Sequence, residues 1–247
     1  MLATRLNHVK IWLKDNPNPT YRRLFLMLKR IRACDIPTPK FYNQFAYAVV
    51  KTINNLIGGL TRVLIYTPAF KGRLNTCGHS LYLYGGLPFI SGPLAIHMGS
   101  QCRISGHTTF SGRTSATQPE LIIGDNVGIG WQTTIAVAGK VILGDNVRIG
   151  GRAFLFGYSG HSLDPKLRAE GIGDDDGHIG DIILERDVWL GTNVTVRQGV
   201  TIGHGTVVAA GSVVTKSLPP MVIAAGNPAR VLKELNSNTY DIRHMEG

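Results

Sequence analysis

A period of six residues governs the hydrophobic pattern between residues 184 and 218. Large apolar side chains open six consecutive hexads without a gap: Leu184, Leu190, Val196, Ile202, Val208 and Val214. The fifth places are mostly small or β-branched: Val188, Val194, Val200, Thr206, Ser212 and Leu218. An amphipathic helix would space its apolar residues about 3.6 apart, and a half-buried strand would alternate them. Neither spacing fits, and a strict period of six indicates a repeat fold.

Three hexads can close one triangular coil, in which each short extended segment supplies an inward side chain. Glycine and asparagine suit the corners because they tolerate positive φ. Successive coils then stack as parallel strands about 4.8 Å apart, and each coil buries its apolar face against its neighbours. The sequence therefore predicts an all-β core, a parallel β-helix of hexapeptide repeats. A series of ordinary short strands, as in a sandwich, is the competing interpretation.

The same period predicts that the β-helix extends over residues 74–218. Residues 74–96 are Gly-rich and irregularly apolar, and we interpret them as the first coil. Regular hexads open at Met98, Ile104, Phe110, Ile123, Ile129, Ile135, Leu143, Ile149 and Leu155. The next hexad opens only at Leu184, so the chain makes an excursion over residues 161–183. Long loops on a rigid repeat scaffold commonly carry function.

The C-terminal part, residues 219–247, begins with two prolines that end the last coil. Residues 221–226 are expected to cross the end of the β-helix. Proline is favoured at the first position of a helix, so Asn227-Pro228 predicts a short C-terminal helix over residues 229–235. A polar tail follows.

Residues 1–73 are predicted to form a basic, mostly helical N-terminal segment bounded by Pro17, Pro19, Pro37 and Pro39. Its second apolar stretch, residues 41–66, has no uncharged run of 18 residues, so no membrane span is predicted. Two interpretations stay open and are compatible. The segment covers the open end of the β-helix, or residues 1–66 rest as a basic amphipathic surface on an anionic membrane.

The formal net charge of +10 is concentrated at the N-terminal end. Residues 1–79 hold 13 Lys/Arg against two Asp, a charge of +11, whereas residues 80–247 carry −1. No nucleic-acid-binding module surrounds the basic segment, so nucleic acid is not an expected partner. Cys34, Cys77 and Cys102 are odd in number and widely spaced, which fits a reducing compartment. Without a signal-peptide pattern, we expect a cytoplasmic protein, peripheral to the inner membrane face if the basic surface binds lipid.

His161 is the first residue of the excursion, beside Gly160. A lone histidine is usually structural, but this one lies where the scaffold breaks. A neutral imidazole can take a proton from an attacking hydroxyl near neutral pH. Asp164 or Glu170 could orient it, and the sequence leaves that choice open. The acidic cluster at residues 174–176 is expected to be solvated.

Five ordered segments resemble the hexapeptide-repeat acyltransferases. They are His161-Ser162-Leu163-Asp164-Pro165, Val188-Trp189-Leu190-Gly191, Gly199-Val200-Thr201-Ile202-Gly203, Ala210-Gly211-Ser212-Val213-Val214-Thr215-Lys216 and Ala225-Gly226-Asn227-Pro228-Ala229-Arg230-Val231. The similarity covers roughly residues 94–235 and is closest to the galactoside, maltose and nodulation-type O-acetyltransferases. It implies a left-handed β-helix, a homotrimer, acetyl-CoA as donor, and an active site in the cleft between neighbouring subunits.

The resemblance also implies roles for particular residues. It makes His161 the general base and puts Trp189 beside the cleft. It assigns coenzyme contacts to Trp189, Thr192, Ala210, Thr215, Lys216 and Arg230, of which Lys216 and Arg230 have the charge to meet phosphates. Gln132 falls near the family's acceptor-binding Asn, and Asp164 is the other candidate for a substrate contact.

Three features depart from the family pattern: the usual His-Pro is His161-Ser162, the excursion is longer, and a basic helical segment replaces a small N-terminal domain. They concern the acceptor and leave the donor unchanged. We therefore predict acetyl transfer from acetyl-CoA to a hydroxyl of a small or lipid-linked sugar, or of a surface-polysaccharide precursor. An N-acetyltransferase acting on an amino sugar or antibiotic, and a non-catalytic trimeric scaffold, are the alternatives.

A zinc hydratase on the same scaffold would need three converging histidines. His178 and His204 show no paired ligand spacing with His161, so no metal is expected.

Overall fold

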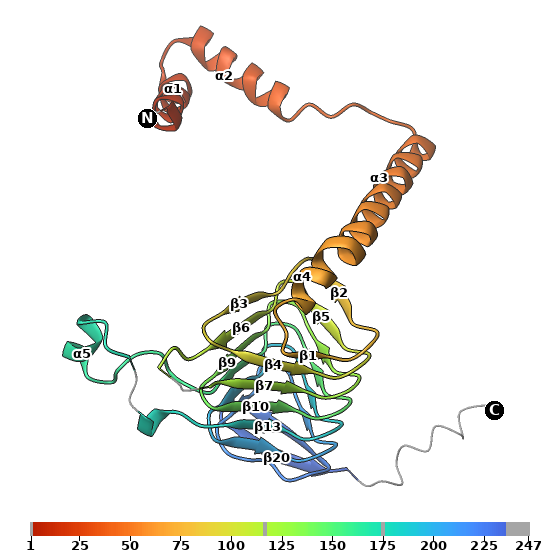
Figure 1. Ribbon diagram of the computed structural model, residues 1–247. Helices are drawn as coiled ribbons and strands as arrows, with labels where there is room; N and C mark the ends of the chain where they lie inside the picture. The colour runs from red at the N-terminus through yellow and green to blue at the C-terminus, as the bar shows by residue number, and fades with distance from the viewer. Residues whose placement is uncertain (1, 116–117, 174–175, 236–247) are drawn as a thin grey trace. The chain divides into compact units, whose positions relative to one another are not determined.

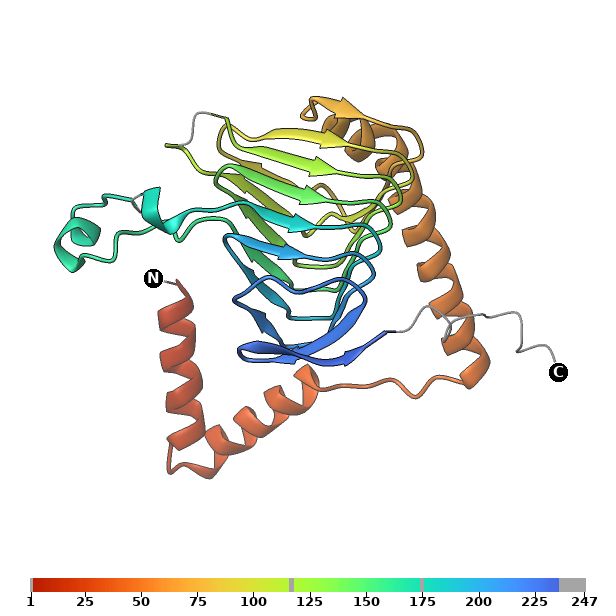
Figure 2. The same ribbon diagram turned by 90° about the horizontal axis from the view of Figure 1, so that it is seen from below.

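A computed structural model describes residues 2–115, 118–173 and 176–235 of the chain. The chain forms two compact units, Met1–Asn55 and Leu56–Gly247, which are described separately. The second unit contains a left-handed parallel β-helix of about six coils with three flat faces (Figures 1 and 2). The fold class predicted from the six-residue period is therefore confirmed.

Each face of the β-helix is one sheet, and the chain visits the three sheets in turn. The first sheet comprises β1 (Thr76–Cys77), β4 (Ala95–Met98), β7 (Glu120–Ile123), β10 (Lys140–Leu143), β13 (Ile182–Leu184) and β16 (Val200–Ile202). The second comprises β2 (Tyr82–Tyr84), β5 (Arg103–Ser105), β8 (Gly128–Ile129), β11 (Arg148–Ile149), β14 (Trp189–Leu190), β17 (Val207–Val208), β19 (Val222–Gly226) and β20 (Ala229–Glu234). The third comprises β3 (Phe89–Ser91), β6 (Thr109–Gly112), β9 (Thr134–Val137), β12 (Phe154–Phe156), β15 (Thr195–Arg197) and β18 (Val213–Val214).

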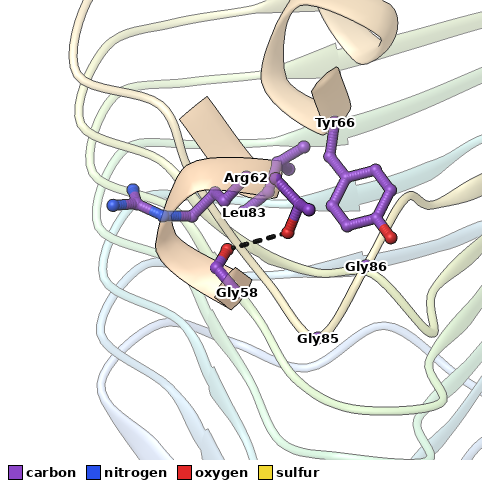
Figure 3. Close-up of a pocket in the computed structure, with 7 residues that line it drawn as sticks. Gly58, Arg62, Tyr66, Leu83, Gly85 and Gly86 are labelled. Carbon is purple, nitrogen blue, oxygen red and sulfur yellow. Dashed lines mark hydrogen bonds between the residues drawn. The ribbon is translucent and has the colours of Figure 1, made fainter. Parts of the chain in front are cut away.

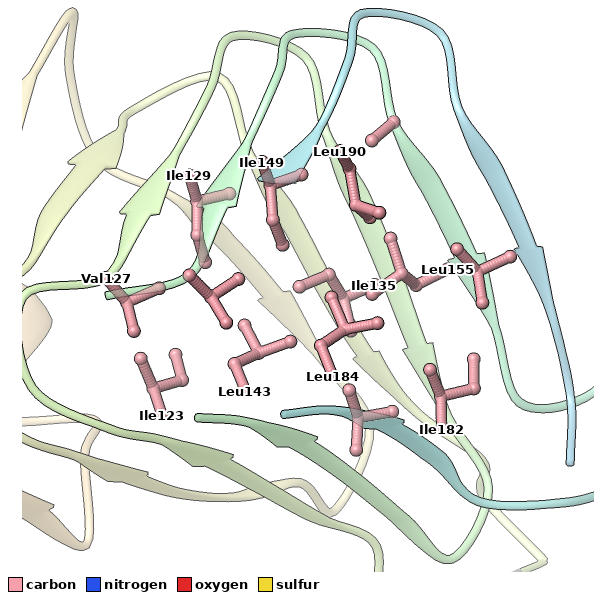
Figure 4. Close-up of a cluster of buried hydrophobic side chains, with 14 of the residues drawn as sticks. Ile123, Val127, Ile129, Ile135, Leu143, Ile149, Leu155, Ile182, Leu184 and Leu190 are labelled. Atoms are coloured by element: carbon pink, nitrogen blue, oxygen red, sulfur yellow. The ribbon is translucent and has the colours of Figure 1, made fainter. Parts of the chain in front are cut away.

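The residues that open the hexads fill the interior of the prism (Figure 4). Ile129, Ile149 and Leu190 lie in register on adjacent strands of the second sheet and are at most 4% exposed. Leu143 and Leu184 are paired in the same way on the first sheet. Because the strands are parallel and in register, each side chain packs on the equivalent residue of the next coil, so the six-residue period becomes a continuous apolar column.

The corners between the first and second sheets carry a ladder of side-chain hydrogen bonds. Asn126 and Asn146 occupy equivalent places with φ of 54° and 61°, a conformation that asparagine tolerates better than most residues. Asn126 Nδ2 donates to Asn146 Oδ1 at 2.8 Å, and Asn146 Nδ2 donates to Asp187 Oδ1 at 2.9 Å. The repeated Gly-Asp-Asn corners therefore join successive coils outside the core.

The predicted C-terminal helix is wrong, because residues 229–234 form strand β20. This strand pairs antiparallel with β19, and Asn227-Pro228 lies in the turn that joins them. The last parallel strand of the second sheet has a free edge, and pairing with β20 satisfies its backbone groups. The hydrogen bonds of this edge outweigh the local preference of proline for a helix start.

The helical N-terminal segment is confirmed. It consists of α1 (Leu2–Asp15), α2 (Pro19–Arg32), α3 (Lys40–Thr61), the π-helix η1 (Arg62–Tyr66) and α4 (Thr67–Lys71). In the first unit, α1 and α2 pair, with the Trp12 and Tyr21 rings 4.8 Å apart. In the second unit, α4 inserts Phe70, 1% exposed, into the core against Phe110. The predicted cap on the β-helix is thus provided by α4.

One helical run has the length and composition of a membrane span, although none was predicted from the sequence. The run Lys40–Lys71 is 32 residues long and has a mean hydropathy of 1.2 in its most apolar window, so it could cross a membrane by length and composition alone. Lys51 and Arg62 interrupt this run. A criterion that requires an uncharged stretch excludes this helix as a membrane span, whereas a criterion based on its mean hydropathy includes it.

We predict that Leu155→Ala lowers the free energy of unfolding by about 2–5 kcal/mol, because it leaves a cavity in the apolar column. Leu155 is 0% exposed. The measurement is urea denaturation followed by circular dichroism. Thr195→Ala is the control, since Thr195 lies on the outer face of the next strand; a change of about 0.5 kcal/mol is expected there. Equal effects of the two substitutions would contradict the role of the column.

Candidate active site

Apart from Trp189 on β14 and Arg230 on β20, the predicted site residues fall on two of the three corners of the β-helix. The excursion corner, between the third and first sheets, carries His161 and Asp164 after β12 and Thr215 and Lys216 after β18. The glycine corner, between the second and third sheets, carries Gln132, Thr192 and Ala210. Within one chain the third sheet separates these two groups.

The excursion leaves the β-helix after β12, which ends at Phe156, and returns at β13, which begins at Ile182 (Figure 2). It contains the short helices α5 (Pro165–Ala169) and η2 (Asp176–His178). His161 is exposed on its first limb, and Ser159 Oγ donates to the His161 carbonyl oxygen at 3.1 Å. The acidic residues 174 and 175 lie outside the described part of the chain.

Asp164 has a structural contact that the sequence analysis did not assign. Its Oδ1 accepts a hydrogen bond from Lys166 N at 2.7 Å, which makes Asp164 the N-cap of α5. Arg168 Nη1 donates to the Ser162 carbonyl oxygen at 2.9 Å and holds the same turn. In the described ranges no hydrogen bond joins the His161 ring to Asp164 or Glu170. The carboxylate of Asp164 therefore fixes the backbone beyond His161.

Thr215 and Lys216 lie on the excursion corner two coils beyond β12, since β12, β15 and β18 pair in sequence. Two coils correspond to about 10 Å along the axis. Lys216 is exposed and Thr215 is half-buried. An extended ligand could follow this edge from Lys216 toward His161.

On the glycine corner, Thr192 and Ala210 are stacked in adjacent coils. Gly211 N donates to the Thr192 carbonyl oxygen at 2.9 Å. A Cβ on Gly191 would lie 2.6 Å from Ala210 N, so only glycine permits this close stacking. Gln132 lies farther along the same corner with a φ of 58°, and its Oε1 accepts a hydrogen bond from Arg152 Nε at 3.0 Å. This contact engages the Gln132 side chain.

Arg230 belongs to the same side of the molecule. Strand β19 ends at the glycine corner, where Gly226 N donates to Ser212 Oγ at 3.1 Å. Arg230 pairs with Ala225 of that strand, is exposed, and donates from Nη1 to the Ala229 carbonyl oxygen at 2.9 Å. The structure thus brings Arg230 close to the corner that carries Ala210.

A groove that the sequence analysis missed runs over the outer face of the second sheet. It has a volume of about 350 Å³ and is bordered by Tyr84, Arg103, Arg148 and Trp189. Arg103, Gly128, Arg148 and Trp189 are successive partners across β5, β8, β11 and β14. Each of these four residues directly precedes an inward residue that opens a hexad. The six-residue period therefore predicts that they lie in one column on the outer face. Two cations and an exposed tryptophan therefore share one column.

Gly128 leaves room for Arg148 to lie across it, because a Cβ there would approach Arg148 Cδ to 3.3 Å. Arg148 Nη2 donates to Asn126 Oδ1 at 3.1 Å, and Nη1 donates to the Asn126 carbonyl oxygen. Burial, and then the neighbouring Arg103, lower the pKa of Arg148 from its ordinary value. Burial also raises the pKa of Tyr84, whose hydroxyl donates to the Ile129 carbonyl oxygen at 3.1 Å. The groove is thus positively charged and has a hydrogen-bonded floor.

Within the described residues, no group of three His, Cys, Asp or Glu side chains is placed to hold a metal ion. His204 lies on the remaining corner, with Nδ1 3.5 Å from Glu185 Oε2.

The family model that matches the chain is described as "Bacterial transferase hexapeptide (six repeats)" and covers residues 181–216. The galactoside O-acetyltransferase of Escherichia coli (strain K12) is 40% identical over 78 residues, 32% of this chain and 36% of that protein. The polysialic acid O-acetyltransferase of Escherichia coli O1:K1 / APEC is 64% identical over 53 residues, 22% of this chain and 17% of that protein. The chain thus spans about a third or less of the length of these relatives.

Among solved structures, a mutant of the N-acyltransferase AntD from Bacillus cereus has a similar fold. The TM-score is 0.55 with 22% sequence identity, covering 69% of this chain and 88% of that one. That protein was solved in complex with dTDP-4-amino-4,6-dideoxyglucose and coenzyme A.

We predict that Asp164→Ala accelerates tryptic cleavage after Lys166 and Arg168 by roughly 2- to 30-fold, because loss of an N-cap destabilises the adjoining turn by about 0.5–2 kcal/mol. Asp164→Asn should cleave at nearly the wild-type rate, since asparagine caps as well as aspartate. Mass spectrometry of the fragments gives the rate at each bond. Indistinguishable rates for both variants and the wild type would show that the cap does not hold the excursion.

Proposed function

The chain belongs to the hexapeptide-repeat acetyltransferases, and on that premise we propose that it transfers an acetyl group from acetyl-CoA to a hydroxyl of a sugar or surface-polysaccharide precursor. The observation that carries this proposal is the excursion. It interrupts an otherwise regular scaffold and leaves His161 exposed at a corner. A positioned imidazole on a rigid frame is suited to general base catalysis.

In the proposed reaction, the His161 imidazole removes the proton from the acceptor hydroxyl. The hydroxyl oxygen attacks the thioester carbonyl carbon, a C–O bond forms, and the C–S bond to the coenzyme breaks. The imidazolium then returns its proton to the departing thiolate, which leaves as the free thiol. Ser159 Oγ donates to the His161 carbonyl oxygen, and Asp164 caps the helix that follows, which supports a defined backbone position for the base.

We propose that the coenzyme lies between two copies of the chain in a homotrimer. One copy would present Thr215 and Lys216 from its excursion corner, and its neighbour would present Thr192, Ala210 and Arg230 from its glycine corner. The separation of these groups within one chain supports a site that is complete only between subunits. Lys216 and Arg230 are exposed and carry the charge to meet phosphates.

The acceptor is proposed to be an acidic sugar. Arginine guanidinium groups match carboxylates and phosphates in charge and geometry, and among the described residues no hydrogen bond or ion pair engages the Arg103 side chain, whose backbone N donates to the Val127 carbonyl oxygen. Trp189 is 55% exposed beside these cations and offers an apolar ring face.

Because acetyl-CoA is the donor, we place the reaction in the cytoplasm.

We predict that His161→Ala lowers kcat by about 10²–10⁴-fold, the usual effect of losing one positioned base. The assay is free-thiol release from acetyl-CoA with neutral sugars, acidic sugars, lipid-linked sugars and amino sugars. His204→Ala is the control, because His204 lies on another corner of the β-helix. Equal rates for wild type and His161→Ala would remove His161 as the base, and turnover restricted to amino sugars would establish N-acetyl transfer.

For an acidic acceptor, Arg103→Ala should raise KM by about 10- to 100-fold, the range for one lost hydrogen bond to a charged group. KM for acetyl-CoA should stay within about twofold, as expected for binding energy lost at the acceptor alone. Arg197→Ala is the matched control, because Arg197 is exposed on the third sheet. Equal KM values for Arg103→Ala and wild type would show that the groove does not bind the acceptor.

A further inference from the structure

The last turns of α3 and the helix η1 face the first coil through their polar side. Gly58, Thr61, Arg62 and Tyr66 line a cavity of about 260 Å³ together with Leu83, Gly85 and Gly86 (Figure 3). The Arg62 guanidinium lies 4.5 Å from the centre of the Tyr82 ring. A surface helix of a globular protein normally turns its apolar side to the core. Here the side that meets the protein carries Thr61 and Arg62, and Tyr66 is the residue of this stretch that packs against the core.

The opposite side of this helix is apolar and uncovered. Leu56, Leu60 and Leu64 follow one another at four-residue intervals and are 63%, 60% and 68% exposed. All three belong to the second unit, as does the β-helix. Their exposure is therefore a property of that unit alone. Burial of three leucines normally stabilises a fold, so this surface is expected to be covered by a partner.

The division into a polar side and an apolar side continues along the whole of α3. Lys40, Lys51 and Arg62 recur every 11 residues, close to three helical turns, so they lie on one line. The other half of the helix carries exposed apolar residues: Phe41, Tyr42, Phe45, Val49, Ile53, Leu56, Ile57 and Leu60. The helix is thus amphipathic over its full length of about 33 Å.

The charge around this helix has one sign. Residues 36–119 contain no Asp or Glu, so no acid accompanies Lys40 and Lys51. Aromatic residues gather in the first turns, where Phe41 and Phe45 are 73% and 67% exposed. Basic residues beside an apolar face, with aromatic side chains among them, are typical of helices that lie in a membrane interface.

We propose that α3 lies flat in the surface of an anionic lipid bilayer, with its apolar side among the acyl chains and Lys40 and Lys51 near the headgroups. The helix is long enough to span a bilayer. However, spanning would place Lys51, Asn54 and Asn55 near its centre, where polar groups are unfavourable. A helix bundle between copies would use a narrower apolar seam with opposite charges at its edges. The proposal does not depend on the acetyl transfer reaction.

The test is flotation of the full chain with vesicles of phosphatidylcholine alone or mixed with phosphatidylglycerol. Wild type should float with the mixed vesicles and be released by alkaline carbonate. Lys40→Gln/Lys51→Gln should lower the partition coefficient roughly 30-fold, because each lysine near an anionic surface contributes about a factor of five. Leu56→Ser/Leu60→Ser/Leu64→Ser should abolish flotation. The matched control, Asn43→Ser/Asn54→Ser/Asn55→Ser, changes the polar side and should float like wild type.

Three outcomes would overturn the proposal. Equal flotation of all variants would show that α3 does not bind the vesicles. Resistance of the wild type to carbonate extraction would establish a spanning helix. If the leucine variant lost mass relative to wild type in sedimentation velocity without lipid, the apolar side would be an interface between copies. Acetyl-CoA turnover with a water-soluble acceptor, measured on the same variants, separates a failure here from a failure of the proposed reaction.

Discussion

The structure depends on the parallel, in-register stacking of equivalent coils. Each strand inside a sheet is hydrogen-bonded to the strands above and below it, and its inward side chains pack on their counterparts in adjacent coils. No coil can bury its own apolar face alone. The two ends therefore need covering, and the chain uses a helix at one end and a hairpin at the other. The inserted Phe70 of α4 and the β19–β20 pair perform these tasks.

The same stacking explains why polar side chains gather at the corners and on the flat faces. The inward positions are occupied by the apolar column, so polar side chains are available only outside it. Successive coils repeat each outer position about 4.8 Å apart, which converts a sequence column into a spatial one. Arg103, Arg148 and Trp189 form the groove for this reason, although they lie far apart in the sequence. The excursion can lengthen without disturbing the column, because it leaves and rejoins at one corner.

The sequence predicted those parts of the fold that follow from a local pattern of residues. The hexads placed the core, the missing hexad placed the excursion, and the prolines placed the N-terminal helices. The hairpin at the other end escaped prediction because its strand pairing depends on a free sheet edge that no local pattern reveals. The groove depends on register between strands. The Asp164 cap was available from the sequence, since Asp followed by Pro is a common helix start, although Asp164 was expected to contact substrate or orient His161. The role of His161 rests on the position of the excursion and is a proposal.

Strand β20 has a further consequence for the molecule in a crowded solution. A stack of parallel strands presents at its end a ready template for another chain, and repeated addition there would produce a fibre. The second sheet instead finishes with an antiparallel strand whose outer residues include Arg230, Lys233 and Glu234. Reversed direction and charge both oppose the addition of a further parallel coil. The hairpin thus closes this edge, and its loss would leave β19 open to pairing with another chain.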